Sequence, residues 1–394
     1  MQAREISQGI KWLGAIDWDR RLFDSLIPLP DGTTYNAYLV EGSDKTVLVD
    51  SVDPTMTHVL LRQLEAVPRV DFVISNHAEK DHSGSIPAVL KRYPDATVLC
   101  SERAVDALID SLEIPRDRVK AVSDGETLDL GGKTLEFLYM PWVHWPETMV
   151  TYLRENRLLF SCDFFGSHIA SSDLYVTDTG RVHEAAKRYF AEVMMPFRSH
   201  IRKHLDRLAS YDIDTIAPSH GQIHIDPQFI MDAHREWAAE EPKNLVVIPF
   251  VSMHGSTGKM VDCLIEELMV RGVGVERFDL TTADIGKLAM ALVDAATIVV
   301  ATPTVLGGPH PLAAYAAFLA NALRPKTKYL SVIGSYGWGG KAVQTLAGMI
   351  PNLKVEVIDP YLTKGLPDGS DCDSIAKLAD EIASRHATLV TPQA

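Results

Sequence analysis

The spacing of apolar and polar positions divides the chain into two parts with different patterns. Before about residue 240, short apolar runs follow one another in groups and helical patterns separate them, which is typical of an α+β sandwich. The expected strands lie at 35–40, 46–50, 71–75, 97–100, 118–123, 133–140, 149–153, 157–161 and 214–217. The expected helices lie at 57–66, 84–92, 102–113, 183–209 and 226–239.

After residue 243, strands and helices alternate strictly. Strands are expected at 245–251, 274–278, 297–301, 329–334 and 353–358, and helices at 257–271, 283–293, 311–323, 340–350 and 371–385. Each strand is followed by a helix, which predicts an α/β doubly wound parallel sheet. The pattern changes at the polar stretch 239–243, which contains Pro242. We therefore expect one domain over residues 1–243 and a second over residues 244–394.

Composition narrows the class of protein. The chain has 394 residues, and 46% of them are hydrophobic, which is enough for two cores. The net charge of −14 argues against nucleic-acid binding, which relies on basic patches. No apolar run reaches the roughly 18 residues of a membrane helix, and the N-terminus lacks the pattern of a signal peptide. We therefore expect a cytoplasmic protein that binds neither membranes nor nucleic acid.

The four cysteines are scattered and form no Cys-x-x-Cys pair; they are Cys100, Cys162, Cys263 and Cys372. A disulfide framework is therefore not expected, and neither is a rubredoxin-type or zinc-ribbon module within this chain. We expect four small, buried thiols.

The most informative stretch is 77–82, His-Ala-Glu-Lys-Asp-His, which places two imidazoles and two carboxylates within six residues. It follows an apolar run that predicts a buried strand, and it precedes a helix start marked by Ser83 and Gly84. Side chains on such a turn project to one end of the sheet, where a binuclear metal site can be built. The alternative is a solvated polar turn without a metal.

Further metal-ligand candidates follow later strands or lie in loops marked by Gly and Pro, namely His144, Asp163 and His220. We expect one metal to be bound by His77, Glu79 and His144, a second by Asp81, His82 and His220, and Asp163 to bridge them. Mixed nitrogen and oxygen ligands without a thiolate favour non-haem iron over structural zinc. Each later candidate has an alternative: His144 as a packed core residue between Trp142 and Trp145, Asp163 as a helix cap, and His220 as a turn residue. His168, His183 and His224 are expected to have no direct role in metal binding.

The second domain carries three loops with the composition of a flavin site. The first, 252–257, leads into a helix, and its hydroxyls, glycine and helix N-terminus form an anion-binding nest. It lacks both the dinucleotide fingerprint and the Walker lysine, so it fits a monophosphate such as that of FMN; the alternative is an ordinary Gly/Ser turn. The other two loops follow the third and fourth strands, where ligands of doubly wound sheets bind. The expected cofactor residues are Ser252, Met253, His254, Gly255, Ser256, Thr257, Pro303, Thr304, Val305, Leu306, Gly307, Ser335, Tyr336, Gly337, Trp338 and Gly339.

With these motifs the chain resembles the A-type flavodiiron proteins over essentially its whole length. The resemblance implies a metallo-β-lactamase-like αββα sandwich followed by a flavodoxin-like domain, with two Fe per chain at the seven ligand positions and FMN in the second domain. It implies an oxidoreductase that reduces O2 to water or, as the alternative, NO to N2O. One departure is His254, where an aromatic residue is more usual.

The resemblance also implies partners. Electrons are expected from an external donor, either rubredoxin or reduced coenzyme F420, and the chain is expected to form a head-to-tail homodimer or a dimer of dimers. Two other classes stay open at this point: a binuclear metallo-hydrolase, against which Glu79 and the flavin loops argue, and a flavodoxin-type electron carrier with a vestigial metal domain.

Overall fold

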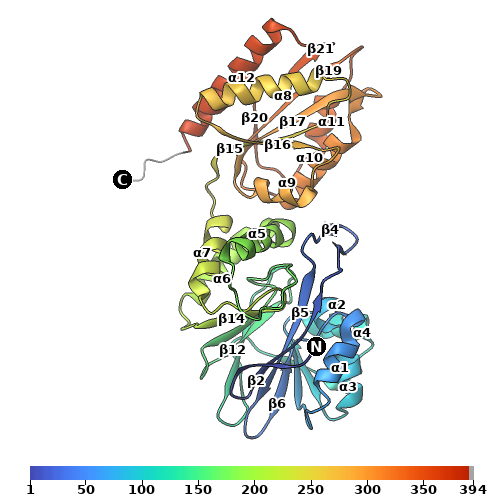
Figure 1. Ribbon diagram of the computed structural model, residues 1–394, viewed down its shortest axis with the longest axis vertical. Coiled ribbons are helices and arrows are strands. Elements are labelled where there is room, and N and C mark those ends of the chain that lie inside the picture. The colour runs from blue at the N-terminus through green and yellow to red at the C-terminus, as the bar shows by residue number, and fades with distance from the viewer. Residues whose placement is uncertain (390–394) are drawn as a thin grey trace. The chain divides into compact units, whose positions relative to one another are not determined.

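The structure is a computed structural model that describes residues 1–389. The chain forms two compact units (Figure 1). The first contains Met1–Tyr189 and Phe197–Ala238, and the second contains Phe190–Pro196 and the chain from Ala239 on. No helix within residues 1–389 combines the length and the apolar character needed to cross a membrane.

Two sheets face each other in the first unit. The larger sheet has the order β1-β2-β5-β6-β7-β8-β9. Its strands are β1 (Arg4–Ser7), β2 (Ile10–Asp17), β5 (Thr33–Glu41), β6 (Thr46–Val49), β7 (Phe72–Ser75), β8 (Thr97–Ser101) and β9 (Val119–Val122). Neither β1 nor β2 was predicted. In β2 the apolar residues do not alternate with polar ones, and its place is decided by antiparallel pairing with β5.

The second sheet of this unit has the order β10-β11-β12-β13-β14. Its strands are β10 (Thr127–Asp129), β11 (Thr134–Tyr139), β12 (Met149–Leu153), β13 (Leu158–Cys162) and β14 (Thr215–Pro218), and a separate hairpin joins β3 (Leu22–Phe23) to β4 (Ile27–Pro28). Helices cover the outer faces of both sheets (Figure 1). They are α1 (Thr57–Gln63), α2 (Lys80–Ser83), α3 (Ile86–Arg92), α4 (Ala104–Leu112), α5 (Thr179–Tyr189), α6 (Arg198–Leu208) and α7 (Pro227–Ala238).

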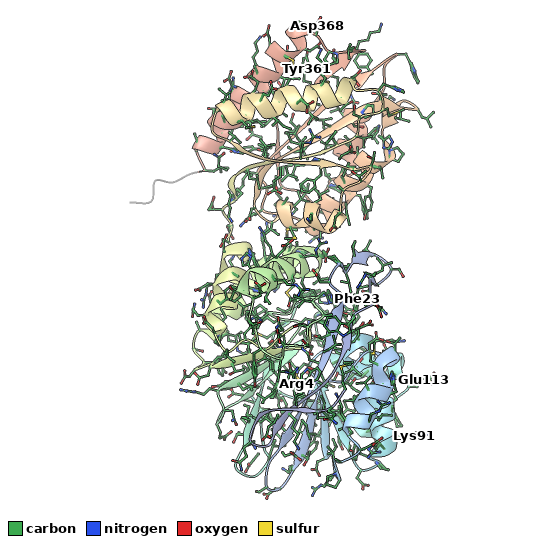
Figure 2. All side chains as sticks on the ribbon, in the orientation of Figure 1. Arg4, Phe23, Lys91, Glu113, Tyr361 and Asp368 are labelled. Atoms are coloured by element: carbon green, nitrogen blue, oxygen red, sulfur yellow. A yellow bond between two sulfur atoms is a disulfide. The ribbon has the colours of Figure 1, made fainter. Side chains whose placement is uncertain are left out.

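The core of the first unit lies between its two sheets, where side chains fill the interior (Figure 2). Val47 and Ile74 from the larger sheet belong to one cluster with Phe137, Met149 and Phe160 from the smaller sheet. Each such side chain contributes roughly 1.5–3 kcal/mol when fully buried. This packing holds the strand ends of both sheets in place and confirms the predicted α+β sandwich.

The helical stretch predicted at 183–209 is helical in the structure, but it is not one continuous α-helix. After α5 the chain continues as a π-helix at Phe190–Met194 and a 3-10 helix at Met195–Phe197, and α6 follows. Pro196 explains the break, because proline cannot donate the backbone hydrogen bond that a continuous helix requires.

The second unit is the predicted doubly wound sheet, with the order β16-β15-β17-β19-β20 and parallel pairing along this path. Its strands are β15 (Lys243–Phe250), β16 (Gly274–Asp279), β17 (Ala295–Val305), β18 (Gly308–Pro309), β19 (Tyr329–Tyr336), β20 (Glu356–Val357) and β21 (Tyr361–Lys364). Its helices are α8 (Ser256–Val270), α9 (Ile285–Leu292), α10 (Pro311–Leu323), α11 (Ala342–Gly348) and α12 (Gly369–Ala387).

Two details of this sheet differ from the prediction. The strand β17 continues to Val305 and pairs with β18, so part of the loop expected after the third strand of this domain is itself strand. The expected strand at 353–358 shrinks to Glu356–Val357, and β21 pairs with β19 further along. Both differences arise from pairing between segments that local sequence patterns do not reveal.

The prediction of four free thiols is wrong for one pair of cysteines. Cys263 on α8 and Cys372 on α12 form a disulfide, with 5.9 Å between their Cα atoms. The two helices pack side by side, although the two cysteines are 109 residues apart in the sequence. Cys100 and Cys162 are buried free thiols, as expected.

Candidate functional site

The stretch 77–82 lies where the first unit turns from β7 into α2. His77 follows β7 and is fully buried, while Asp81 and His82 lie on α2 and are buried as well. Glu79 stands directly before α2 and is partly exposed. Three of the four metal-competent side chains are thus withdrawn from solvent, unlike those of a solvated polar turn.

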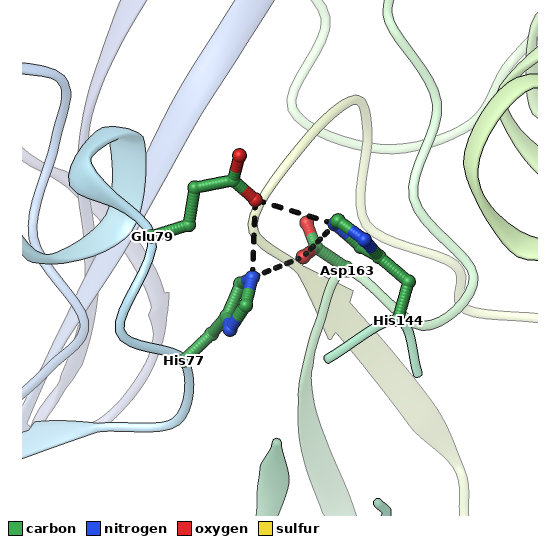
Figure 3. Close-up of side chains that lie close together, drawn as sticks. All are labelled: His77, Glu79, His144 and Asp163. Carbon is green, nitrogen blue, oxygen red and sulfur yellow. Dashed lines mark hydrogen bonds and ion pairs between the residues drawn. The ribbon is translucent and has the colours of Figure 1, made fainter. Parts of the chain in front are cut away.

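The first ligand group consists of His77, Glu79, His144 and Asp163 (Figure 3). Glu79 Oε2 lies 3.1 Å from His77 Nε2 and 3.3 Å from His144 Nε2. Asp163 Oδ2 lies 3.5 Å and 3.6 Å from the same two nitrogens. Imidazole nitrogens and carboxylate oxygens therefore converge on one point, which suits a divalent transition metal.

The second ligand group consists of Asp81, His82 and His220. Asp81 Oδ2 lies 3.3 Å from His82 Nε2 and 3.0 Å from His220 Nε2. The other oxygen of Asp163, Oδ1, lies 3.0 Å from His82 Nε2 and 3.6 Å from His220 Nε2. Asp163 thus presents one oxygen to each group, as a carboxylate shared by two metal ions would.

The electrostatics of the two groups fit bound cations. Both carboxylate oxygens of Asp81, and Asp163 Oδ2, accept no hydrogen bond from the residues that the structure describes. Burial alone would raise the pKa of Asp163, but His82 and His77 hold it well below its usual range. Burial would likewise lower the pKa of His82, yet Asp163 and Asp81 raise it to about 9. The imidazole protons thus stand in for positive charge that metal ions would supply.

Three residues that were not predicted from the sequence form hydrogen bonds with the candidate ligand side chains. Glu147 Oε1 accepts a hydrogen bond from His77 Nδ1 at 2.6 Å. The backbone carbonyl of Thr34 accepts one from His220 Nδ1, also at 2.6 Å. The Tyr189 hydroxyl donates to Asp163 Oδ1 at 2.7 Å. Such contacts orient metal ligands. They cannot be predicted from local spacing, because each partner is far away in the sequence.

The ligand loops are tied together by a further buried carboxylate, Asp50. Its oxygens accept hydrogen bonds from the backbone and side chain of Asn76, which precedes His77, and from Ser219, which precedes His220. Burial raises the pKa of Asp50. Asp50 has a positive φ of 56°, and Cys162, just before Asp163, has a φ of 52°. Such backbone conformations in residues other than glycine cost free energy and cluster at functional sites.

The three expected flavin loops come together at the carboxyl edge of the second unit's sheet. They surround a cavity of about 290 Å³ lined by Met253, His254, Ser256, Thr257, Pro303, Thr304, Ser335, Tyr336, Gly337 and Gly365. Thr257 and Ser335 lie with their hydroxyl oxygens 3.2 Å apart, beside the N-terminus of α8. Free backbone N–H groups and hydroxyls at a helix N-terminus suit a phosphate. Gly365, which follows β21, was not predicted.

The remaining expected flavin residues are not among those that line this cavity, although they belong to the same three loops; they are Ser252, Gly255, Val305, Leu306, Gly307, Trp338 and Gly339. The Ser252 hydroxyl accepts a hydrogen bond from the Gly258 N–H at 3.0 Å and so closes the loop onto α8. Gly255 has a φ of 86°, which explains why glycine stands there. Leu306 and Trp338 are 97% and 81% exposed.

The other histidines named from the sequence lie outside the ligand groups found among the described residues. His168 is buried with its ring 4.6 Å from that of His220, and its Nδ1 lies 2.9 Å from the Thr33 hydroxyl. His183 packs against Trp237, and His224 is buried. Of these three, His168 packs against a residue of the ligand groups.

Comparison with known proteins agrees with this arrangement. The model of the ODP family beta lactamase matches residues 33–221. A nitric oxide reductase from Moorella thermoacetica is 37% identical over 97% of this chain and 98% of its own. A coenzyme F420H2 oxidase from Methanothermobacter marburgensis is 32% identical over 97% of this chain and 98% of its own.

Solved structures share the fold of both domains. Rubredoxin:oxygen oxidoreductase from Desulfovibrio gigas matches with a TM-score of 0.94 and 30% identity, covering 98% of this chain and 99% of its own. The similarity in sequence and in structure extends over nearly the full length of this chain and of its relatives. The chain therefore belongs to the flavodiiron protein family, the family that its motifs resemble.

Proposed function

We propose that this chain reduces O2 to water at two irons that receive electrons through FMN, with reduction of NO to N2O as the second candidate reaction. The observation that supports this most directly is Asp163, whose two oxygens each face one of the two histidine-containing groups. That arrangement of oxygens and imidazole nitrogens would hold two metal ions. Two neighbouring irons and a flavin, when bound, supply the electrons that such a reduction needs.

The protein side chains have distinct parts in this proposal. Glu79 would supply an anionic oxygen to the iron of the first group, and Asp163 would contribute a carboxylate to both irons. The Tyr189 hydroxyl, which donates to Asp163 Oδ1, keeps that carboxylate in its bridging orientation. In the second domain, the hydroxyls of Thr257 and Ser335 are proposed to hold the FMN phosphate beside the N-terminus of α8.

The Moorella thermoacetica relative is named a nitric oxide reductase, and the solved Desulfovibrio gigas structure is named a rubredoxin:oxygen oxidoreductase. The names of similar proteins therefore support both NO and O2 as the substrate. Anaerobic stopped-flow mixing of the fully reduced protein with O2 and, separately, with NO decides between them, after iron and FMN per chain are measured. Faster oxidation by O2 without peroxide supports the first reaction, and faster oxidation by NO with N2O formed supports the second. Two zinc ions and no reaction with either gas would restore the hydrolase interpretation.

The electron donor is proposed to be rubredoxin or reduced coenzyme F420, since relatives named for each are similar to this chain. Reduction of the FMN in the purified protein by each donor, followed at the flavin absorption band, tests this directly. Cytoplasmic residence stays a prediction.

A homodimer is proposed because each unit exposes apolar side chains near its own site. Near the flavin cavity these are Met253, Leu306, Trp338 and Leu366; on and beside the β3–β4 hairpin they are Trp18, Leu22 and Leu26. Phe23 of that hairpin packs against the His168 and His220 rings. Trp338→Glu is expected to shift the protein toward monomer in analytical ultracentrifugation, and an unchanged sedimentation coefficient would remove this residue from the interface.

A further inference from the structure

Glu147 is a buried carboxylate that lies behind the first ligand group. It is only 4% exposed, and its Oε1 is 2.6 Å from His77 Nδ1. The opposite nitrogen of the same ring, His77 Nε2, faces Glu79 and Asp163. Glu147 therefore contacts the candidate metal position through the imidazole of His77 and not directly.

Glu147 is fixed at both its side chain and its backbone. The same Oε1 atom also accepts a hydrogen bond from the Ala78 N–H at 3.1 Å. Ser101, the last residue of β8, donates its hydroxyl to the Glu147 carbonyl at 2.5 Å. A carboxylate that accepts two N–H groups is stabilised in its charged form. The Glu147 carboxylate thus lies directly against the outer nitrogen of one candidate metal-ligand histidine.

The corresponding contact of His220 in the second ligand group is with a neutral acceptor, and the buried carboxylate of Asp50 acts on His82 of that group only through space. There His220 Nδ1 donates to the backbone carbonyl of Thr34, again at 2.6 Å. The two hydrogen bonds have the same length, but one acceptor carries a full negative charge and the other is a neutral dipole. A carboxylate partner makes an imidazole a more basic metal ligand than a carbonyl partner does.

We propose that Glu147 is a positioning residue that makes the two irons inequivalent, by strengthening His77 as a ligand and favouring the oxidised form of the iron in the first group. This inference rests on the proposed two-iron site. If so, the iron of the first group has the lower reduction potential of the two irons. The same iron also binds more tightly than it would without Glu147.

The test compares three variants of the full-length protein. Glu147→Gln removes the charge but keeps an oxygen acceptor, and Glu147→Asp keeps the charge on a shorter side chain. Glu155→Gln is the matched control, because Glu155 is an exposed carboxylate in the turn between β12 and β13. Each apoprotein is titrated with Co²⁺ and, anaerobically, with Fe²⁺ to measure metal affinity. Each iron-loaded protein is then titrated potentiometrically, and electron paramagnetic resonance detects the mixed-valence iron pair.

In Glu147→Gln, the affinity for one of the two ions is expected to fall roughly 10- to 100-fold while the other stays unchanged. The lower iron potential is expected to rise, so the mixed-valence signal persists over a narrower range of potentials. Glu147→Asp is expected to recover most of the affinity and the width of that range, and Glu155→Gln is expected to match the parent.

Parent-like affinities and an unchanged range in Glu147→Gln would overturn the proposal. So would equal losses in the Gln and Asp variants with an unchanged range, because these would indicate packing alone. If Glu147→Gln does not fold, Glu147→Asp decides: a small loss confined to one of the two Co²⁺ affinities supports the proposal, and equal losses at both ions or no loss at either overturn it. The proposed function is tested separately, by the iron content of the parent protein and by its oxidation with O2 or NO. The Co²⁺ titration tests the role of Glu147 even if the parent protein takes up no iron.

Discussion

The two candidate sites of this protein are built in opposite ways. In the metal site, His77, Asp163 and His220 are at most 1% exposed, and each has a second hydrogen-bond partner behind it. In the flavin site, Met253, His254 and Gly337 line the cavity and are exposed to solvent. The metal site is part of its domain's core, whereas the flavin site is an open pocket at the edge of a sheet.

This difference follows from the ligands that each site is proposed to take. Metal ions are small and must be surrounded by charged groups, which are stable inside a protein only when they are paired and oriented. A flavin is large and planar, so loops at the carboxyl ends of strands can hold it with backbone groups and a few hydroxyls. The two sites should therefore respond separately to mutation.

The largest expected effect comes from His77→Ala. Loss of this imidazole removes a candidate ligand from the first group, so turnover of O2 or NO should fall to the background rate. FMN content should stay at the parent level, because the flavin cavity belongs to the other unit. Activity, iron and FMN per chain are measured together.

The control for this change is His58→Ala, which removes an exposed imidazole from α1 in the same domain. It should keep parent iron content and activity. Loss of FMN from His77→Ala would contradict the independence of the two sites.

The next effect concerns the flavin domain, which is constrained by a disulfide between α8 and α12. Opening the Cys263–Cys372 bond releases a loop of 109 residues in the unfolded state, which should lower the free energy of unfolding by roughly 4 kcal/mol. Denaturant unfolding followed by flavin fluorescence, with and without reductant, measures this. In the double variant Cys263→Ser/Cys372→Ser, added reductant should change nothing; a parent insensitive to reductant would show that the bond does not stabilise this domain.

Buried neutral histidines should make the metal domain sensitive to acid. Burial lowers the pKa of His234 to about 3 and that of His224 to about 4, whereas an unfolded histidine titrates near 6.5. Between these values the unfolded chain binds more protons at these two positions, so the contribution of His234 and His224 to stability falls as the pH drops below about 6.5. For His234 the loss by about pH 4 is roughly 3 kcal/mol.

Denaturant unfolding of the apoprotein at about pH 7 and pH 4.5 tests this dependence. His234→Gln should reduce the acid loss because its side chain does not titrate, and His58→Gln should leave the loss unchanged. An identical loss in the parent and in His234→Gln would assign the acid sensitivity to other groups.

The smallest expected effect comes from Thr257→Ala at the start of α8. Its hydroxyl lies in the flavin cavity beside that of Ser335. Loss of one hydrogen bond to the phosphate should weaken FMN binding about 10-fold, or about 1.4 kcal/mol. Titration of the apoprotein with FMN measures the Kd. Thr282→Ala, an exposed site in the same domain, should bind like the parent, and an unchanged Kd in Thr257→Ala would remove this hydroxyl from the phosphate site.

Much of both sites follows from local patterns in the sequence. Strand ends and Gly- or Pro-marked loops carried all seven metal-ligand candidates, and the structure places them in two groups joined by Asp163. Their role as ligands stays a prediction until metal is measured. Glu147 and Tyr189 could not be found in this way, because they approach His77 and Asp163 from 70 and 26 residues away.

The sequence by itself determined the order of helices and strands in each domain and the kind of side chain that follows each strand. These are local properties, set by hydrophobic periodicity and turn chemistry. The tertiary structure alone decided the partners behind the ligands, the disulfide between α8 and α12, the strands β1 and β2, and the break between α5 and α6. Those features depend on strand pairing and helix packing between distant segments, which local spacing does not encode.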